Sequence, residues 1–171
     1  MFRLLKLRVL LVSLAAVLAV ASHVSALDKC KAAYVGGTLA QFPYPSDHTE
    51  GCLDFSDASH LVFTAGRNAT EGRRVRIAYA NIQDLEFGQK VSRRVATTMS
   101  AAALAGPMAL LTRPTSRHHY LTITFLDEER RNQVVILELG KDIVRSTLST
   151  LEARSGKRIE CQDEEARKWL H

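Results

Sequence analysis

The sequence is poor in the patterns that mark catalytic and metal-binding proteins. Its 171 residues include only three cysteines and six histidines, with no CxxC pair and no close clustering of Cys with His. Structural zinc sites carry such spacing, so we expect no metal and no cofactor. There is also no G-x-S-x-G nucleophile elbow. We therefore expect no catalytic residues and no enzymatic activity. An enzyme, such as a hydrolase, with a site that the sequence does not reveal is the alternative.

A strong excess of one charge is also absent once residues 1–26 are set aside. The chain has 23 basic and 18 acidic residues, and three of the basic ones, Arg3, Lys6 and Arg8, lie in 1–26, which hold no acid. The remaining 145 residues carry 20 basic and 18 acidic side chains, a net charge of +2. Nucleic-acid-binding domains concentrate basic residues on one face. We therefore expect no nucleic-acid partner.

Residues 1–26 have the three parts of a secretory signal peptide. A basic start is followed by the apolar run Val9–Ala21, interrupted only by Ser13, and then by Val24-Ser25-Ala26, a typical cleavage site. The apolar run is shorter than the roughly 20 residues of a membrane span. We expect export to the periplasm or outside the cell, with a mature chain that begins near Leu27. An uncleaved N-terminal anchor is the alternative.

Three cysteines remain after such cleavage, namely Cys30, Cys52 and Cys161. Export permits disulfides, and an odd number of cysteines leaves one thiol over. We favour a Cys30–Cys52 disulfide because it closes a short loop. Its rival, Cys30–Cys161, would tie the two ends of the mature chain together.

Short runs of alternating apolar and polar residues follow one another along the mature chain. Turn-forming residues separate them every eight to twelve positions, a pattern typical of an antiparallel β domain. The expected extended segments are 34–39, 53–55, 59–65, 75–79, 82–87, 119–126 and 134–139.

The periodicity changes from β to helical after residue 140. Val144, Leu148 and Leu151 share one helical face, Asp142 is the expected N-cap, and Gly156 the expected stop. In the charged tail 157–171 we expect a short strand (KRIEC) and a helical, loosely attached segment (DEEARKWL).

Several short stretches of this pattern resemble the pleckstrin-homology and GRAM-like (PH/GRAM-like) fold, over about residues 33–155. The stretches are Gly51-Cys52-Leu53 leading into Leu61-Val62-Phe63, Ile77-Ala78-Tyr79 before Ile82, and Leu121-Thr122-Ile123 pairing with 133–139. The resemblance implies about seven antiparallel strands in a bent sheet or small barrel capped by a C-terminal helix. The chain also looks like small uncharacterised exported bacterial proteins that carry FGQK (87–90) and ELGKDIVR (138–145) stretches.

This resemblance points to a fold more than to a function, because the fold hosts lipid, peptide and protein binding as well as scaffolding. The turn between the early strands lacks a Lys-x-Arg cluster of the kind that binds phosphoinositides. Recognition of such headgroups is therefore not carried over. We divide the chain into the signal peptide 1–26, a PH/GRAM-like domain 27–156 with an insertion at 89–118, and the tail 157–171.

Residues 95–111 (VATTMSAAALAGPMALL) within this insertion contain no charge and favour helix, although Gly106-Pro107 should break it. Three alternatives remain for this segment. It packs against this domain or a partner, it dips into a bilayer whose anionic headgroups contact the basic flanks, or it associates with a second copy of the chain. The residues expected to contact a membrane or partner are Lys90, Arg93, Arg94, Met99, Leu104, Met108, Leu110, Leu111, Arg113 and Arg117.

Other polar clusters have ordinary structural explanations. His118 and His119 are adjacent beside a strand and should point to opposite faces, which argues against one shared metal. The acidic and basic residues of 127–131 fit a solvated hairpin. Arg74 and Arg76 share one strand face, which is a solvent face or an anion-binding edge. Together these features predict a non-catalytic binding or scaffold module at the cell envelope, whose partner is an envelope protein or the membrane surface.

Overall fold

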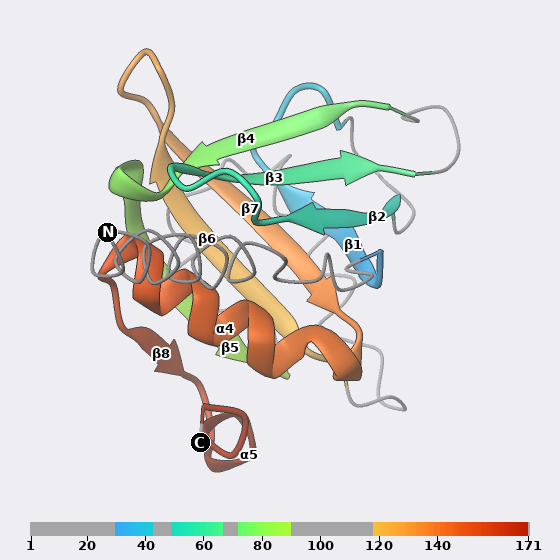
Figure 1. Ribbon diagram of the computed structural model, residues 1–171, viewed down its shortest axis with the longest axis vertical. Coiled ribbons are helices and arrows are strands. Elements are labelled where there is room, and N and C mark those ends of the chain that lie inside the picture. The colour runs from blue at the N-terminus through green and yellow to red at the C-terminus, as the bar shows by residue number, and fades with distance from the viewer. Residues whose placement is uncertain (1–29, 43–48, 67–71, 90–117, 171) are drawn as a thin grey trace, which may run out of the picture.

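The computed structural model of the chain describes residues 30–42, 49–66, 72–89 and 118–170. Alternating apolar residues produce eight strands in this part of the chain, followed or interrupted by short helices (Figure 1). The strands are β1 (Ala32–Gly37), β2 (Thr49–Asp54), β3 (His60–Ala65), β4 (Arg74–Ala78), β5 (Ile82–Gly88), β6 (Tyr120–Leu126), β7 (Asn132–Leu139) and β8 (Ile159–Cys161). The helices are η2 (Tyr79–Asn81, a 3-10 turn), α4 (Lys141–Ser155) and α5 (Glu164–Arg167).

The strands form one curled sheet in the order β4-β3-β2-β1-β7-β6-β5-β8. Every neighbouring pair is antiparallel except β5 and β8, which run parallel. Helix α4 lies across one face of this sheet (Figure 1). The predicted mainly-β class with a C-terminal helix is confirmed. The sheet has eight strands rather than about seven because the tail adds β8.

The hydrophobic core lies between the inner face of the sheet and α4. Along β6, Leu121, Ile123 and Phe125 point inward, since every second side chain of a strand faces the same side. From α4, Val144, Leu148 and Leu151 meet them with none of their surface exposed. The predicted apolar face of the helix is therefore confirmed.

Both ends of α4 are set by glycine, and one end differs from the prediction. Gly156 ends the helix in a left-handed conformation (φ 68°), and its N–H donates to the carbonyl of Glu152 at 3.0 Å. At the other end Gly140 is the N-cap and Asp142 lies in the first turn. The expected Asp142 cap is wrong because its carboxylate pairs with Lys31, next to the start of β1.

The C-terminal tail is held by the sheet. Strand β8 pairs with β5 through the register Leu85↔Ile159, Glu86↔Glu160 and Phe87↔Cys161. Ile159 is 7 % exposed, and Trp169 packs against the core. The predicted strand and helix of the tail are present, but the expected loose attachment is wrong. A sequence pattern of three strand residues does not reveal the distant strand with which they pair.

The predicted disulfide is present between Cys30 and Cys52, and Cys161 is a free, half-buried thiol. The bond links the residues before β1 to β2, its antiparallel neighbour. A disulfide of this kind indicates folding in an oxidising environment.

Two predicted segments lie outside the described residues. These are the signal peptide 1–26 and, apart from Gln89 and His118, the apolar insertion 89–118. In the part of the chain that the structure describes, no helix is long and apolar enough to cross a membrane.

Candidate functional site: a cleft along the edge of β4

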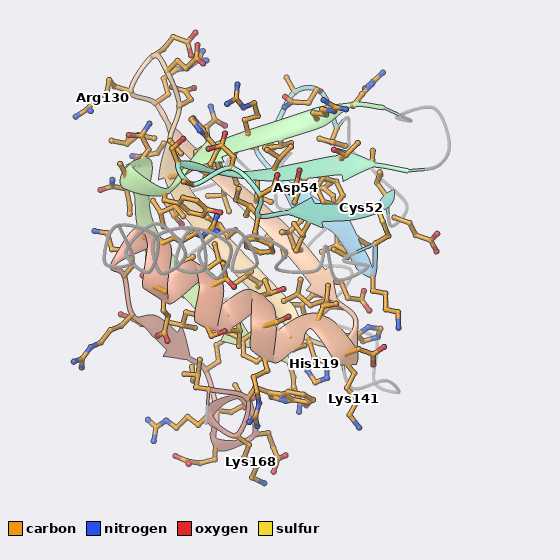
Figure 2. The ribbon with its side chains drawn as sticks, in the orientation of Figure 1. Cys52, Asp54, His119, Arg130, Lys141 and Lys168 are labelled. Carbon is orange, nitrogen blue, oxygen red and sulfur yellow. A yellow bond between two sulfur atoms is a disulfide. The ribbon has the colours of Figure 1, made fainter. Side chains whose placement is uncertain are left out.

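A cleft of about 480 Å³ lies between strand β4 and the hairpin that joins β6 to β7. Leu39, Val75 and Phe125 supply apolar surface in it, whereas both rims are polar or charged. Figure 1 shows the β6–β7 hairpin passing the end of β4 and projecting beyond it, and Figure 2 places Arg130 on the projecting part. The cleft therefore follows the border where the curled sheet stays open.

Strand β4 is the terminal strand of the sheet, so only one of its edges has a partner strand within the described region. The register pairs Leu61 with Ile77 and Phe63 with Val75. Two backbone hydrogen bonds lie at the two ends of this pairing. The N–H of Tyr79 donates to the carbonyl of Ser59, and the N–H of Ala65 donates to the carbonyl of Arg73, both at 2.9 Å. Their positions identify the hydrogen-bonded pairs of the β3–β4 ladder.

Hydrogen-bonded residues alternate with outward-facing residues along an antiparallel strand. Because Arg73 and Tyr79 bond to β3, Val75 and Ile77 do so as well. The backbone N–H and C=O groups of Arg74, Arg76 and Ala78 therefore point away from the sheet. Arg76 and Ala78 also line the cleft. An unpaired strand edge of this kind can pair with another extended chain.

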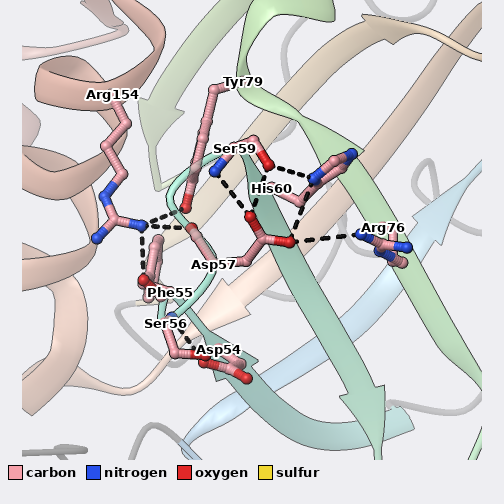
Figure 3. A network of polar contacts seen from close by, with 9 residues as sticks. All are labelled: Asp54, Phe55, Ser56, Asp57, Ser59, His60, Arg76, Tyr79 and Arg154. Atoms are coloured by element: carbon pink, nitrogen blue, oxygen red, sulfur yellow. Dashed lines mark hydrogen bonds and ion pairs between the residues drawn. The ribbon is translucent and has the colours of Figure 1, made fainter.

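The rim beside β4 contains a polar network centred on Asp57, shown in Figure 3. Asp57 Oδ1 accepts hydrogen bonds from the backbone N of Ser59 at 2.8 Å and from its hydroxyl at 2.6 Å. Asp57 Oδ2 lies 3.3 Å from His60 Nδ1 and 3.4 Å from Arg76 Nη2. The hydrogen bonds from Ser59, followed by the charge of His60, hold the pKa of Asp57 well below its usual range.

This network contains the residue types of a hydrolytic triad but not its geometry. In a triad the histidine donates a hydrogen bond from one ring nitrogen to the aspartate and accepts one from the serine at the other ring nitrogen. Here Ser59 Oγ, at 2.8 Å, and Asp57 both approach Nδ1 of His60. Ser59 Oγ also donates to Asp57 directly. These three side chains consequently close a turn at the start of β3 and are not arranged as a proton relay.

Arg154, near the end of α4, holds the same turn from the other side (Figure 3). Its Nη1 donates to the carbonyls of Phe55 at 2.5 Å and Asp57 at 2.7 Å, and to the hydroxyl of Tyr79 at 3.2 Å. The guanidinium carbon also lies 5.5 Å from the centre of the Tyr79 ring, a cation–π distance. Burial raises the pKa of Tyr79, although the bond from Arg154 opposes this shift.

The opposite rim is the turn between β6 and β7, in which Arg131 pairs with two acidic side chains. Arg131 Nε donates to Asp127 Oδ2 at 2.8 Å, and its Nη2 donates to Glu129 at 2.9 Å. Gln133 also donates to Asp127 Oδ2, at 2.8 Å. Partial burial would raise the pKa of Asp127, but the hydrogen bonds from Arg131 and Gln133 lower it to about 2. The predicted solvated hairpin is confirmed.

The base of the cleft is fixed where β1 ends. Thr38 Oγ1 donates to the side chain of Gln133 at 2.5 Å and accepts from the N–H of Val134 at 2.9 Å. Gly37 precedes it with φ 146°, and a Cβ there would lie 2.2 Å from the carbonyl oxygen of Val134. The close approach of β1 to β7 therefore requires glycine at this position.

The adjacent histidines have separate partners. His118 Nδ1 lies 2.6 Å from a carboxylate oxygen of Glu138, whereas the His119 ring lies 6.1 Å from Phe87 and 4.8 Å from Trp169. Burial lowers the pKa of His119. The predicted packing role is confirmed for His119. In the described region no group of three or more His, Cys, Asp or Glu side chains could hold a metal ion.

The residues predicted to contact a membrane or partner, from Lys90 to Arg117, lie outside the described residues, so their contacts stay a prediction. The cleft was not predicted, because its two rims are about 50 residues apart in sequence. One signal was present, since Arg74 and Arg76 alternate with Val75 and Ile77. No protein-family model matches this chain, and no curated protein matches it.

Proposed function

We propose that this protein is an exported, non-catalytic binding module of the PH/GRAM-like kind that acts at the cell envelope. The order of strands followed by a C-terminal helix supports the fold resemblance. The disulfide and the sequence of residues 1–26 support export. Beside the cleft, which His60 lines, the arrangement of Ser59, His60 and Asp57 offers no relay for hydrolysis.

The partner that fits the cleft is an extended peptide segment of another envelope protein, bound by strand addition to β4. One observation carries this proposal: among the residues that the structure describes, the outward backbone groups of Arg74, Arg76 and Ala78 have no partner strand, and they lie beside a cleft of about 480 Å³. Strand addition gains affinity from main-chain hydrogen bonds and specificity from alternate side chains. Because Arg74 and Arg76 are exposed on one face, acidic residues at alternate positions of the peptide suit this edge.

Selection from a library of random linear peptides tests the proposal, with the mature protein as bait. We expect enriched peptides with alternating acidic residues. Their binding should be lost in Arg76→Pro, because proline removes the outward N–H that an added strand would use. Proline is tolerated at a strand edge whose N–H faces solvent, so the fold should survive.

Arg76→Ala is the matched control, because it removes the charge and keeps the N–H. It should weaken binding much less than Arg76→Pro. Equal losses in both variants would show that the side chain, and not the strand edge, carries binding. Unchanged binding in Arg76→Pro would exclude β4 as the site.

A further inference from the structure

The outer face of β1, β7 and β6, which is turned away from α4, is buried. Its apolar side chains include Val134 (1 % exposed), Ile136 (0 %) and Tyr120 (3 %). None of them belongs to the core cluster between the sheet and the helix. A sheet with one face in solvent would carry polar residues at these positions. This sheet therefore has apolar surface on both faces.

Two polar side chains lie in the same outer layer. Thr122 is 2 % exposed and stands opposite Glu86, which is 5 % exposed, on neighbouring strand β5. Oε2 of Glu86 has no hydrogen-bond partner in the described part of the chain. A buried carboxylate oxygen without a partner is costly. The layer that covers this face should therefore bring a positive charge or a donor near Glu86.

The chain leaves and re-enters the sheet at the border of this face. Strand β5 ends at Gly88, strand β6 begins at Tyr120, and these two residues are opposite each other in the register. Between them lies the uncharged stretch 95–111. A helix that ends at the Gly106-Pro107 break would cover 95–105 and span about 16 Å, and residues 107–111 continue beyond it; the seven residues of β6 span about 23 Å. The stretch is therefore tethered at this face and long enough to run along it.

We propose that residues 95–111 pack on the outer face of β1, β7 and β6 as a second apolar layer of the same domain. The segment has no charge to desolvate, and its flank brings Lys90, Arg93 and Arg94 directly after the strand that carries Glu86. Tethering at both ends gives it a high effective concentration, with which a second copy or a bilayer must compete. The segment is then a structural layer of the domain, whose function rests on the separate β4 cleft.

Photo-cross-linking in the full chain tests this placement. Apart from Met1, the methionines of the chain are Met99 and Met108, so photo-methionine labels the segment at two places. Irradiation with and without phosphatidylglycerol vesicles should link both positions to peptides from 118–139 at the mass of a single chain. Cross-links confined to lipid or to a second copy, or no link to 118–139, would overturn the proposal.

A double-mutant comparison provides an independent readout. Ile136→Ala should lower the melting temperature of the native chain, and much less so when 95–111 is replaced by a Gly/Ser linker of equal length. Leu137→Ala, one residue along the strand but in the inner core, should lower it equally in both backgrounds. If the linker chain does not fold, Leu104→Asn replaces it as the second background. An equal effect of Ile136→Ala in both backgrounds would contradict the proposed contact.

Discussion

The contribution of α4 to stability can be measured at Leu148. This side chain has none of its surface exposed and lies in the core cluster between the helix and the sheet. Leu148→Ala removes three carbon groups, which at about 0.8 kcal/mol each corresponds to about 2.4 kcal/mol of lost burial. The cavity that remains adds to this cost, and Leu→Ala substitutions in protein cores lower the free energy of unfolding by about 2–5 kcal/mol. We expect a loss of about 3–4 kcal/mol in the free energy of unfolding.

Urea unfolding followed by circular dichroism and by the fluorescence of Trp169, the single tryptophan, measures this loss. Arg145→Ala is the matched control, since Arg145 is exposed on the same helix and should change stability by no more than about 0.5 kcal/mol. The midpoint of the Leu148→Ala transition should shift to lower urea without a change in its slope. Equal midpoints for the two variants would refute the packing of α4 on the sheet.

Three further predictions concern processing, the disulfide and pH. The intact mass of the exported protein should match a chain that starts within a residue or two of Leu27; a membrane-bound form that retains Met1 would contradict this. Non-reducing peptide mapping should link Cys30 to Cys52 and find Cys161 free, and removal of the bond should cost about 3 kcal/mol for a loop that spans 22 positions; a bridge that includes Cys161 would disprove the pairing. Because burial lowers the pKa of His119 from 6.5, the unfolded chain binds more protons than the folded protein below that value, and stability should fall as the pH drops from 7 to 5. His119→Gln should flatten this dependence, whereas Asp57 and Asp127, with lowered pKa values, affect stability below about pH 5; an unaltered pH profile in His119→Gln would exclude His119 as its source.

The sequence predicts the elements whose patterns are local. Alternation identifies β3 and β6 to within a residue or so, and the helical spacing of Val144, Leu148 and Leu151 with Gly156 identifies α4. The N-cap was misplaced because Asp142 has a competing partner, Lys31, that is more than 100 residues away in sequence. Local patterns contain no information on such distant partners.

Pairing between strands explains the remaining differences between the fold expected from the sequence and the fold of the structure. The alternation of β6 suggests that Thr122 faces solvent, yet this side chain is 2 % exposed. The nearly continuous apolar run of β7 was the better signal, since strands buried on both faces have this composition. The open edge of β4 and the parallel pairing of β8 depend on the order of strands in the sheet, which no single segment specifies.

The two edges of the sheet differ in how they limit self-assembly. Strand β8 has only three residues, with the charged Glu160 at its centre, and short charged strands discourage further pairing. Strand β4 leaves five residues open on the other edge of the described sheet. Growth of a continuous fibre by edge-to-edge pairing of sheets needs two edge strands on every molecule that can accept another strand. With one receptive edge, two copies can pair β4 against β4 around a twofold axis, and the assembly then closes at a dimer.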